Sequence, residues 1–219
     1  METKNTIDNV KKIIENAGLY IAKKEDLDYL SEIAADAYKF YPLHNWLMSN
    51  KYNIKKSKQI MLISLKTMLN DIIIYADSKE MNGFAVWVPY DFKGIKASKF
   101  LFNGGLKLLL TTNPKMFVRL SRYESYAMKV KKEVINEPHW YAYNLCVKQD
   151  MQGKGISDKL FNPMMDYFDQ ENITAYLETN NFSNLEVYDR FGFEPKSESL
   201  IPGSNIKHYG MVRKPKNLK

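Results

Sequence analysis

The spacing of apolar residues predicts a helix-rich first half of the chain. Apolar residues recur at helical spacing over residues 25–40 and again over residues 54–69. A shorter amphipathic helix is expected at residues 8–16, with Asp8 as its N-cap. Pro42 is expected to close the helix at 25–40.

Three short strands are expected among these helices. One lies at residues 19–22, and two more, at 71–76 and 83–89, flank a polar stretch at 77–82 that suits a hairpin turn. From residue 95 to 134 the pattern is helical, with breaks at Gly104-Gly105 and Asn113-Pro114.

The last third of the chain alternates strand and helix. Strands are expected at 140–147, 175–178, 194–200 and 208–213, with helices at 156–170 and 184–191. This order predicts an α/β fold with a mixed central sheet and helices on its faces. No repeat or linker divides the chain, so residues 1–219 are interpreted as one domain with a helical insertion at about 91–137. Pro163 falls inside the helix at 156–170, where the sequence offers no reason for it.

Composition narrows the class of protein. The 219 residues are 45% hydrophobic and 13% aromatic, which is typical of a folded domain with a sizeable core. One cysteine cannot form an internal disulfide, and with three histidines it is a poor supply of ligands for a structural zinc, so we expect no metal and a reducing, cytoplasmic location. We also expect no signal peptide and no membrane partner, because the N-terminus is polar and no apolar run approaches the roughly 18 residues of a span.

The net charge of +7 is unevenly placed. Residues 91–137 contain ten Lys/Arg and four Asp/Glu. Lys93, Lys96 and Lys99 are interpreted as a solvated helix face, with a lid over a bound ligand as the alternative. No motif for nucleic acid is present, so no nucleic-acid partner is expected.

A glycine-containing turn follows the strand at 140–147. Gly153 and Gly155 would let the backbone approach a ligand closely, and the unpaired N–H groups of the following helix favour an anion. An ordinary strand-to-helix loop is the alternative. A P-loop fails because Lys148 stands where its first glycine is needed, and a dinucleotide fingerprint fails because Asp158 replaces its third glycine.

The turn Gln152-Gly-Lys-Gly-Ile-Ser157 resembles the phosphate turn of the GNAT superfamily of N-acetyltransferases, Gln/Arg-x-x-Gly-x-Gly/Ala, with Ser157 as a departure at the last position. A second motif of that superfamily follows in Tyr176-Leu-Glu-Thr-Asn180, then Asn184, Tyr188 and Gly192-Phe193 at its spacing. Upstream, Trp87-Val-Pro89 and His44-Asn-Trp46-Leu47 look like the puromycin-acetyltransferase-like branch.

The resemblance implies a GNAT fold that binds acetyl-CoA where two parallel strands splay apart, here residues 141–147 and 175–178. By the same resemblance the pantetheine arm and the phosphates would contact one set of residues: Leu145, Cys146, Val147, Gln152, Gly153, Lys154, Gly155, Ile156, Ser157, Asn184 and Tyr188. The alternatives are a helix N-cap for Asn184 and a core aromatic for Tyr188.

The implied reaction moves an acetyl group from acetyl-CoA to a primary amine by direct attack, which is acyltransferase chemistry of EC class 2.3.1. Tyr188 is expected to protonate the departing thiolate as general acid. Glu178 is the expected general base, with His139 as runner-up. Glu178 could instead accept a backbone N–H in the next loop.

Two further interpretations stay open. Cys146 sits beside the presumed thioester, but a lone cysteine in an apolar strand is more often simply packed. The same fold could also serve a non-catalytic acyl-CoA binder or sensor. The acceptor site is expected at residues 38–47 and in 95–126, the acceptor is expected to be a small-molecule amine, and the sequence allows a monomer or a homodimer.

Overall fold

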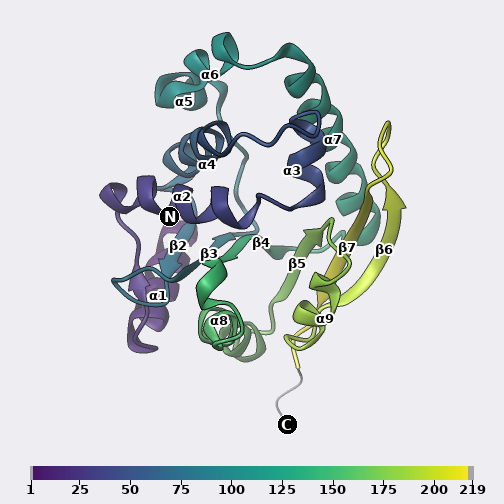
Figure 1. The fold of residues 1–219 in the computed structure, drawn as a ribbon. Helices are drawn as coiled ribbons and strands as arrows, with labels where there is room; N and C mark the ends of the chain where they lie inside the picture. Colours follow the sequence, from purple (N-terminus) through teal and green to yellow (C-terminus); the bar gives the residue numbers. More distant parts are fainter. Residues whose placement is uncertain (1, 217–219) are drawn as a thin grey trace.

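A computed structural model describes residues 2–216. Its centre is a seven-stranded sheet of order β1-β2-β3-β4-β5-β7-β6 (Figure 1). The strands are β1 (Tyr20–Ile21), β2 (Ile73–Ala76), β3 (Gly83–Val88), β4 (His139–Val147), β5 (Thr174–Thr179), β6 (Glu194–Leu200) and β7 (Lys207–Arg213). Among these strands β4 and β5 form the parallel pair, and the other neighbours run antiparallel. The predicted mixed α/β class is therefore confirmed.

Helices cover both faces of the sheet. The described helices are α1 (Glu2–Asn16), α2 (Leu27–Ala37), α3 (Pro42–Leu47), α4 (Ile54–Met68), α5 (Ala97–Phe100), α6 (Leu106–Thr111), α7 (Pro114–Val134), α8 (Ile156–Gln170) and α9 (Asn184–Asp189). Short turns of other helix types lie at Lys24–Asp26, Leu101–Gly105 and Gln149–Met151. None of the helices in this part of the chain is both long enough and apolar enough to cross a bilayer.

The two faces have separate hydrophobic cores. On one face α1 and α8 pack against the sheet through Val10, Ile14, Leu160 and Phe168, which meet Trp87 and other strand residues. On the other face α2 and α4 cover β2, β3 and β4. The helix α7 covers the β5–β7 end of that second face, where Tyr123, Ala127 and Val130 are buried.

Two predicted boundaries were wrong. The first helix begins at Glu2 and not at Asp8, so Asp8 lies inside α1 and caps nothing. Pro42 does not simply close a helix, because α2 has already ended at Ala37 and Pro42 is the first residue of α3. Its fixed φ and missing N–H suit that position.

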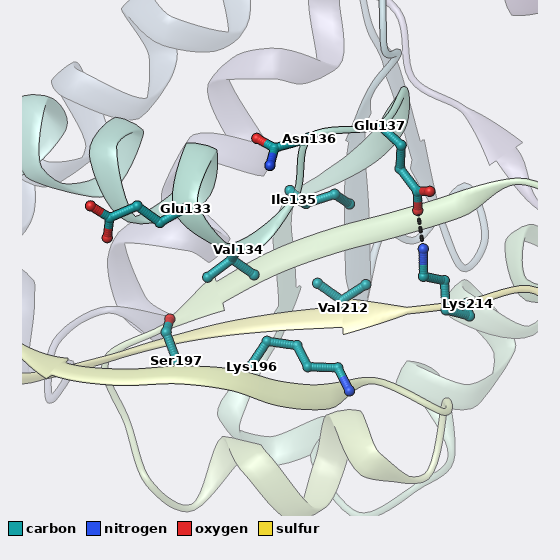
Figure 2. A pocket seen from close by; sticks show the side chains of 9 residues that line it. All are labelled: Glu133, Val134, Ile135, Asn136, Glu137, Lys196, Ser197, Val212 and Lys214. Carbon is teal, nitrogen blue, oxygen red and sulfur yellow. Dashed lines mark hydrogen bonds and ion pairs between the residues drawn. The ribbon is translucent and has the colours of Figure 1, made fainter.

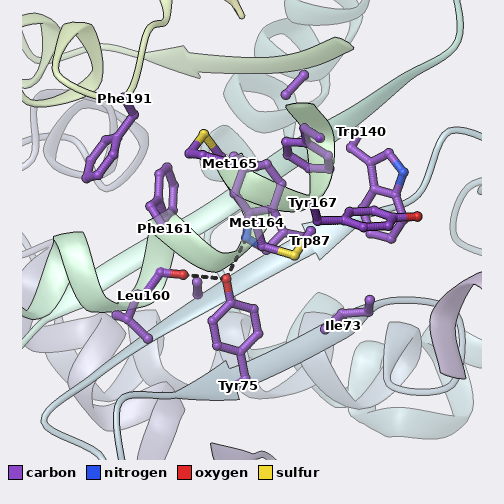
Figure 3. Packing of buried hydrophobic residues seen from close by; sticks show 14 of the residues in the cluster. Ile73, Tyr75, Trp87, Trp140, Leu160, Phe161, Met164, Met165, Tyr167 and Phe191 are labelled. Atoms are coloured by element: carbon purple, nitrogen blue, oxygen red, sulfur yellow. Dashed lines mark hydrogen bonds between the residues drawn. The ribbon is translucent and has the colours of Figure 1, made fainter. Parts of the chain in front are cut away.

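Pro163 lies within an unbroken α8, close to a hydrogen bond that the sheet makes with this helix. A proline leaves the carbonyl four residues earlier without its N–H partner and bends the helix. The next carbonyl, that of Leu160, accepts a hydrogen bond of 2.6 Å from the buried Tyr75 hydroxyl, which itself accepts one of 3.0 Å from Trp87 Nε1 (Figure 3). The sheet thus supplies a side-chain donor to the stretch of helix that the proline disturbs.

Candidate active site

The strands β4 and β5 stay paired over only three positions. Their register runs from His139↔Thr174 to Tyr141↔Tyr176 and then stops, although β4 continues to Val147 and β5 to Thr179. On its other edge β4 remains paired with β3 as far as Gly83↔Val147. The β5-facing backbone of β4 therefore has no strand partner beyond Tyr141, and Leu145, Cys146 and Val147 all lie on this unpaired stretch.

The glycine turn continues from that unpaired stretch. Gly153 and Gly155 have φ of +76° and +75°, which side chains rarely adopt, and no atom lies within 4 Å of where a Cβ would stand on either. Gln152, Lys154 and both glycines are exposed, and α8 begins at Ile156. The turn therefore presents open backbone at a helix N-terminus, where N–H groups lack internal partners.

A third glycine sets how closely this turn meets the sheet. A Cβ on Gly83 would stand 2.7 Å from Ile156 Cγ2 and 3.0 Å from the Cys146 carbonyl oxygen. The start of α8 is thus seated directly against β3 and β4. Gln152 Nε2 also donates to the Val147 carbonyl oxygen at 3.4 Å, which ties the turn to the end of β4.

Asn184 and Tyr188 approach from α9. Ser183, not Asn184, occupies the N-cap position, so that alternative for Asn184 was wrong; the Asn184 amide donates to Thr179 Oγ1 at 3.2 Å. Burial raises the pKa of Tyr188, and the nearby Tyr41 and Cys146 side chains raise it further. The phenol is therefore protonated at neutral pH and can donate a proton.

The end of β5 is bound to the loop between α2 and α3. The Tyr41 hydroxyl lies 3.0 Å from Thr179 Oγ1 and accepts a hydrogen bond of 2.7 Å from the Asn180 backbone N–H. The Tyr38 ring stacks on His44 at 4.1 Å between centroids, and its hydroxyl donates to Asn144 Oδ1. Burial lowers the pKa of His44 to about 4, so this imidazole is neutral at pH 7.

Glu178 is surrounded by phenols. Its Oε1 accepts hydrogen bonds from Tyr123 at 3.1 Å and Tyr141 at 3.2 Å, and its Oε2 accepts one from Tyr176 at 3.3 Å. The carboxylate is 13% exposed. Its hydrogen bonds within residues 2–216 come from phenols and not from a backbone N–H in the next loop, so the alternative role for Glu178 was wrong. Gly210 makes room for this arrangement, because a Cβ there would stand 3.1 Å from the Tyr176 hydroxyl.

His208 lies beside the same carboxylate. Its Nε2 is 3.7 Å from Glu178 Oε2, and its Nδ1 lies 3.3 Å from the Asn180 amide nitrogen. If the amide donates to Nδ1, Nε2 carries the proton and points it toward the carboxylate. Burial lowers the pKa of His208, and the charge of Glu178 opposes that shift.

The remaining candidates occupy less central positions. Cys146 is buried, and burial raises the pKa of its thiol to about 12, which leaves it an unreactive core residue. His139 stands at the closed end of the β4–β5 pair, with Nδ1 2.8 Å from the Glu137 carbonyl oxygen. Within residues 2–216 no group of three or more His, Cys, Asp or Glu is arranged to hold a metal ion.

Two surface hollows lie away from the splayed strands. Figure 2 shows one, with Val134, Ile135 and Val212 inside it and the Glu137–Lys214 ion pair at its edge. The other lies between α3 and the β6–β7 turn and is lined by residues such as Trp46 and Ile206. Neither contains a residue of the predicted cofactor site.

Comparison with known proteins finds a family resemblance in the last half of the chain. Residues 117–193 match the sequence model described as the acetyltransferase (GNAT) family, a span that includes the unpaired stretch of β4, the glycine turn and α9. This part of the chain is similar to the GNAT family of acetyltransferases. A curated relative, an uncharacterised N-acetyltransferase of Schizosaccharomyces pombe, is 39% identical over 68 residues. The matched residues make up 31% of this chain and only 28% of the relative's length.

Solved structures share the GNAT fold over nearly the whole chain. Arylalkylamine N-acetyltransferase 2 from Aedes aegypti superposes with a TM-score of 0.58 at 14% identity, covering 90% of this chain and 98% of that one. A Corynebacterium glutamicum structure described as histone acetyltransferase HPA2 and related acetyltransferase gives 0.56 at 16%, covering 90% and 96%. Ribosomal-protein-S18-alanine N-acetyltransferase from Escherichia coli gives 0.51 at 12%, covering 92% and 95%.

The sequence did not reveal the phenols around Glu178. Tyr176 and Glu178 are two residues apart on one strand, and that spacing could have placed them on the same face. Tyr123 and His208 could not have been assigned to the group, because α7 and β7 reach it only through the tertiary fold.

Proposed function

We propose that this protein is a member of the GNAT family and an acetyl-CoA-dependent N-acetyltransferase that acts on a primary amine. The observation that supports it is the unpaired β4 backbone running directly into a turn with two left-handed glycines at the start of α8. An extended chain with amides can pair with such an edge, and a pyrophosphate suits such a turn.

Acetyl-CoA fits the residues at this place. The backbone of Leu145, Cys146 and Val147 would pair with the pantetheine arm, and Asn184 would bond it from α9. The N–H groups from Gln152 to Ser157 would hold the pyrophosphate, with Lys154 adding positive charge in an exposed position. When bound, acetyl-CoA supplies a thioester whose carbonyl accepts the amine.

Tyr188 is the proposed general acid. Attack by the amine gives a tetrahedral oxyanion, which a strand N–H near Cys146 would stabilise, and collapse expels a thiolate that needs a proton. Tyr188 is protonated at neutral pH and lies near Cys146. A covalent route through Cys146 has no support, because its thiol is buried and its pKa is raised to about 12.

Glu178 is the proposed general base for the incoming ammonium. It follows the last β4–β5 pair by two residues, so it lies where the strands diverge, whereas His139 lies at the paired end. Three phenols and His208 surround the carboxylate. A proton taken from the amine, directly or through a water, would enter this hydrogen-bonded group.

The acceptor is proposed to be a small-molecule amine that approaches from the side of Tyr38, Tyr41 and Tyr123. The similar structures carry names of both small-molecule and protein acetyltransferases, so those names do not choose between the two. The puromycin-acetyltransferase-like branch, the cytoplasmic location and the choice between monomer and homodimer stay predictions.

One assay distinguishes the enzyme from a non-catalytic acyl-CoA binder. Purified protein is mixed with acetyl-CoA and a broad amine panel, and released CoA is measured with a thiol reagent while calorimetry measures acetyl-CoA binding. The single cysteine is buried, so the protein itself should give little background. Amine-dependent release of CoA supports the enzyme. Binding without release supports the binder, and absence of binding overturns both.

A further inference from the structure

The helical segment that precedes α7 combines positive charge with exposed apolar side chains. Residues 92–123, called here the basic segment, contain seven Lys/Arg and no Asp/Glu. Three of these cations contact other parts of the protein. Lys99 forms an ion pair with Asp71 at 2.7 Å, and Arg122 lies against Gly203. Arg119 donates hydrogen bonds to the Trp46 carbonyl oxygen and to Ser49. In the part of the chain described, no carboxylate lies within ion-pair distance of the others: Lys93, Lys96, Lys107 and Lys115.

Large apolar side chains project from the same segment. Phe102 is 91% exposed and Leu110 is 79% exposed. Five more large apolar residues of the segment are also exposed: Ile95, Leu101, Leu106, Leu109 and Val118. Leu106, Leu109 and Leu110 share one face of α6, because residues three and four apart on a helix are neighbours. A solvated helix face, the interpretation favoured by the sequence, does not account for these side chains.

The segment is attached to the body of the protein by its inner face. Leu108 is buried, and Gly104 faces the Ile63 side chain of α4. The Lys56 ammonium donates to the Thr111 carbonyl oxygen at 3.3 Å and to its hydroxyl at 3.1 Å. The exposed leucines and Phe102 are therefore what remains after the segment has packed against α4.

Its position does not suit a lid over the phosphate turn. Figure 1 shows α5 and α6 at one end of the molecule and α8 near the other. Residues 95–110, with their exposed apolar side chains, are called here the tip.

We propose that residues 95–110 dock this protein reversibly on membrane surfaces that contain anionic lipids. Phe102, Leu106 and Leu110 would enter the headgroup region, and the exposed lysines would lie among the lipid phosphates. Charge favours this occupant over a second copy of the chain, because two tips would bring like charges together. The proposal differs from the expectation of no membrane partner, which was based on the absence of a spanning segment, and it does not depend on the proposed activity.

The test is co-sedimentation of the full chain with phosphatidylcholine vesicles, with and without phosphatidylglycerol. We expect binding to the anionic vesicles to be at least ~tenfold stronger than to the neutral ones and to weaken with added salt. The double variant F102S/L110S should lose ~tenfold or more of that binding, and K96Q/K107Q should weaken it and reduce its salt dependence. Both pairs are exposed, so the fold should be retained, as circular dichroism can check.

Matched controls lie elsewhere on the surface. F40S removes a 74% exposed aromatic outside the segment, and K24Q/K132Q removes two exposed charges; neither should change vesicle binding. Failure to sediment with anionic vesicles, or equal binding by F102S/L110S, overturns the proposal. Self-association that F102S/L110S abolishes would instead assign the tip to a second copy, and binding to polyglutamate without vesicle binding would assign it to an acidic protein.

Discussion

The Tyr75 hydroxyl donates a hydrogen bond of 2.6 Å to the carbonyl oxygen of Leu160, three residues before Pro163 in α8. Removing the hydroxyl with Tyr75→Phe leaves that carbonyl and the buried Trp87 indole N–H without this partner. We expect a loss of about 1–3 kcal/mol in the free energy of unfolding, measured by urea denaturation. In a Pro163→Ala background the loss should be nearly the same, because the restored N–H would face the Lys159 carbonyl and not that of Leu160. A loss that Pro163→Ala abolishes would contradict this assignment of the bond.

Local pattern was enough to predict many of the elements around the site. The bounds of α8 match the prediction. The helical pattern is also interrupted at Gly104 and at Asn113, as predicted. Those features depend on residues close in sequence. The environment of Glu178 does not, because it requires the register of β5 against β7 and the placement of α7 over both. The hydrogen bond beside Pro163 could not be predicted for the same reason, since its donor, Tyr75, comes from β2.

Tyr188→Phe tests the proposed general acid. The ring keeps its packing near Phe161 and Phe193, and only the hydroxyl is lost. Turnover should fall by about 10²–10⁴-fold, with little change in acetyl-CoA affinity measured by calorimetry. Unchanged turnover would remove Tyr188 from its assigned role.

Gly155→Ala tests the phosphate turn. The substitution forces a side chain into positive φ and places a methyl group in the open space where the phosphates are proposed to lie. Gly18→Ala is the matched control, because Gly18 has a φ of +73° and the same open surroundings but lies between α1 and β1. Each should lose about 1–2 kcal/mol of stability. Only Gly155→Ala should weaken acetyl-CoA binding, and equal affinities in the two variants would contradict the assignment.

Glu178→Gln tests the proposed base with a side chain of nearly the same shape. The amide oxygen can still accept a phenol hydrogen bond, so the fold should survive. Turnover should fall by about 10²-fold or more. The pH–rate profile should also lose the rise with pH that a general base produces. Glu133→Gln, an exposed change on α7, is the control and should keep the wild-type profile. The base assignment fails if both variants behave alike.

His44 makes stability depend on pH in a predictable direction. Burial lowers the pKa of its imidazole from 6.5 to about 4. Between those values the unfolded chain binds a proton that the folded chain does not, so stability should fall as pH drops from 6.5 toward 4, by at most about 1.4 kcal/mol per pH unit for this group. His44→Phe should reduce the change in the urea midpoint between pH 7 and pH 5. Some slope should remain, because burial also lowers the pKa of His139 and His208; an unchanged slope would contradict the account.

The short β4–β5 pairing divides the sheet into two parts. Strands β1 to β4 form one part and β5 to β7 the other, and only three register positions join their backbones. A side-chain hydrogen bond from Tyr141 of β4 to Glu178 of β5 adds to this connection. A pantetheine arm paired with β4 would therefore act as a missing strand, and the bound molecule would be part of the architecture that holds the two halves at a fixed angle.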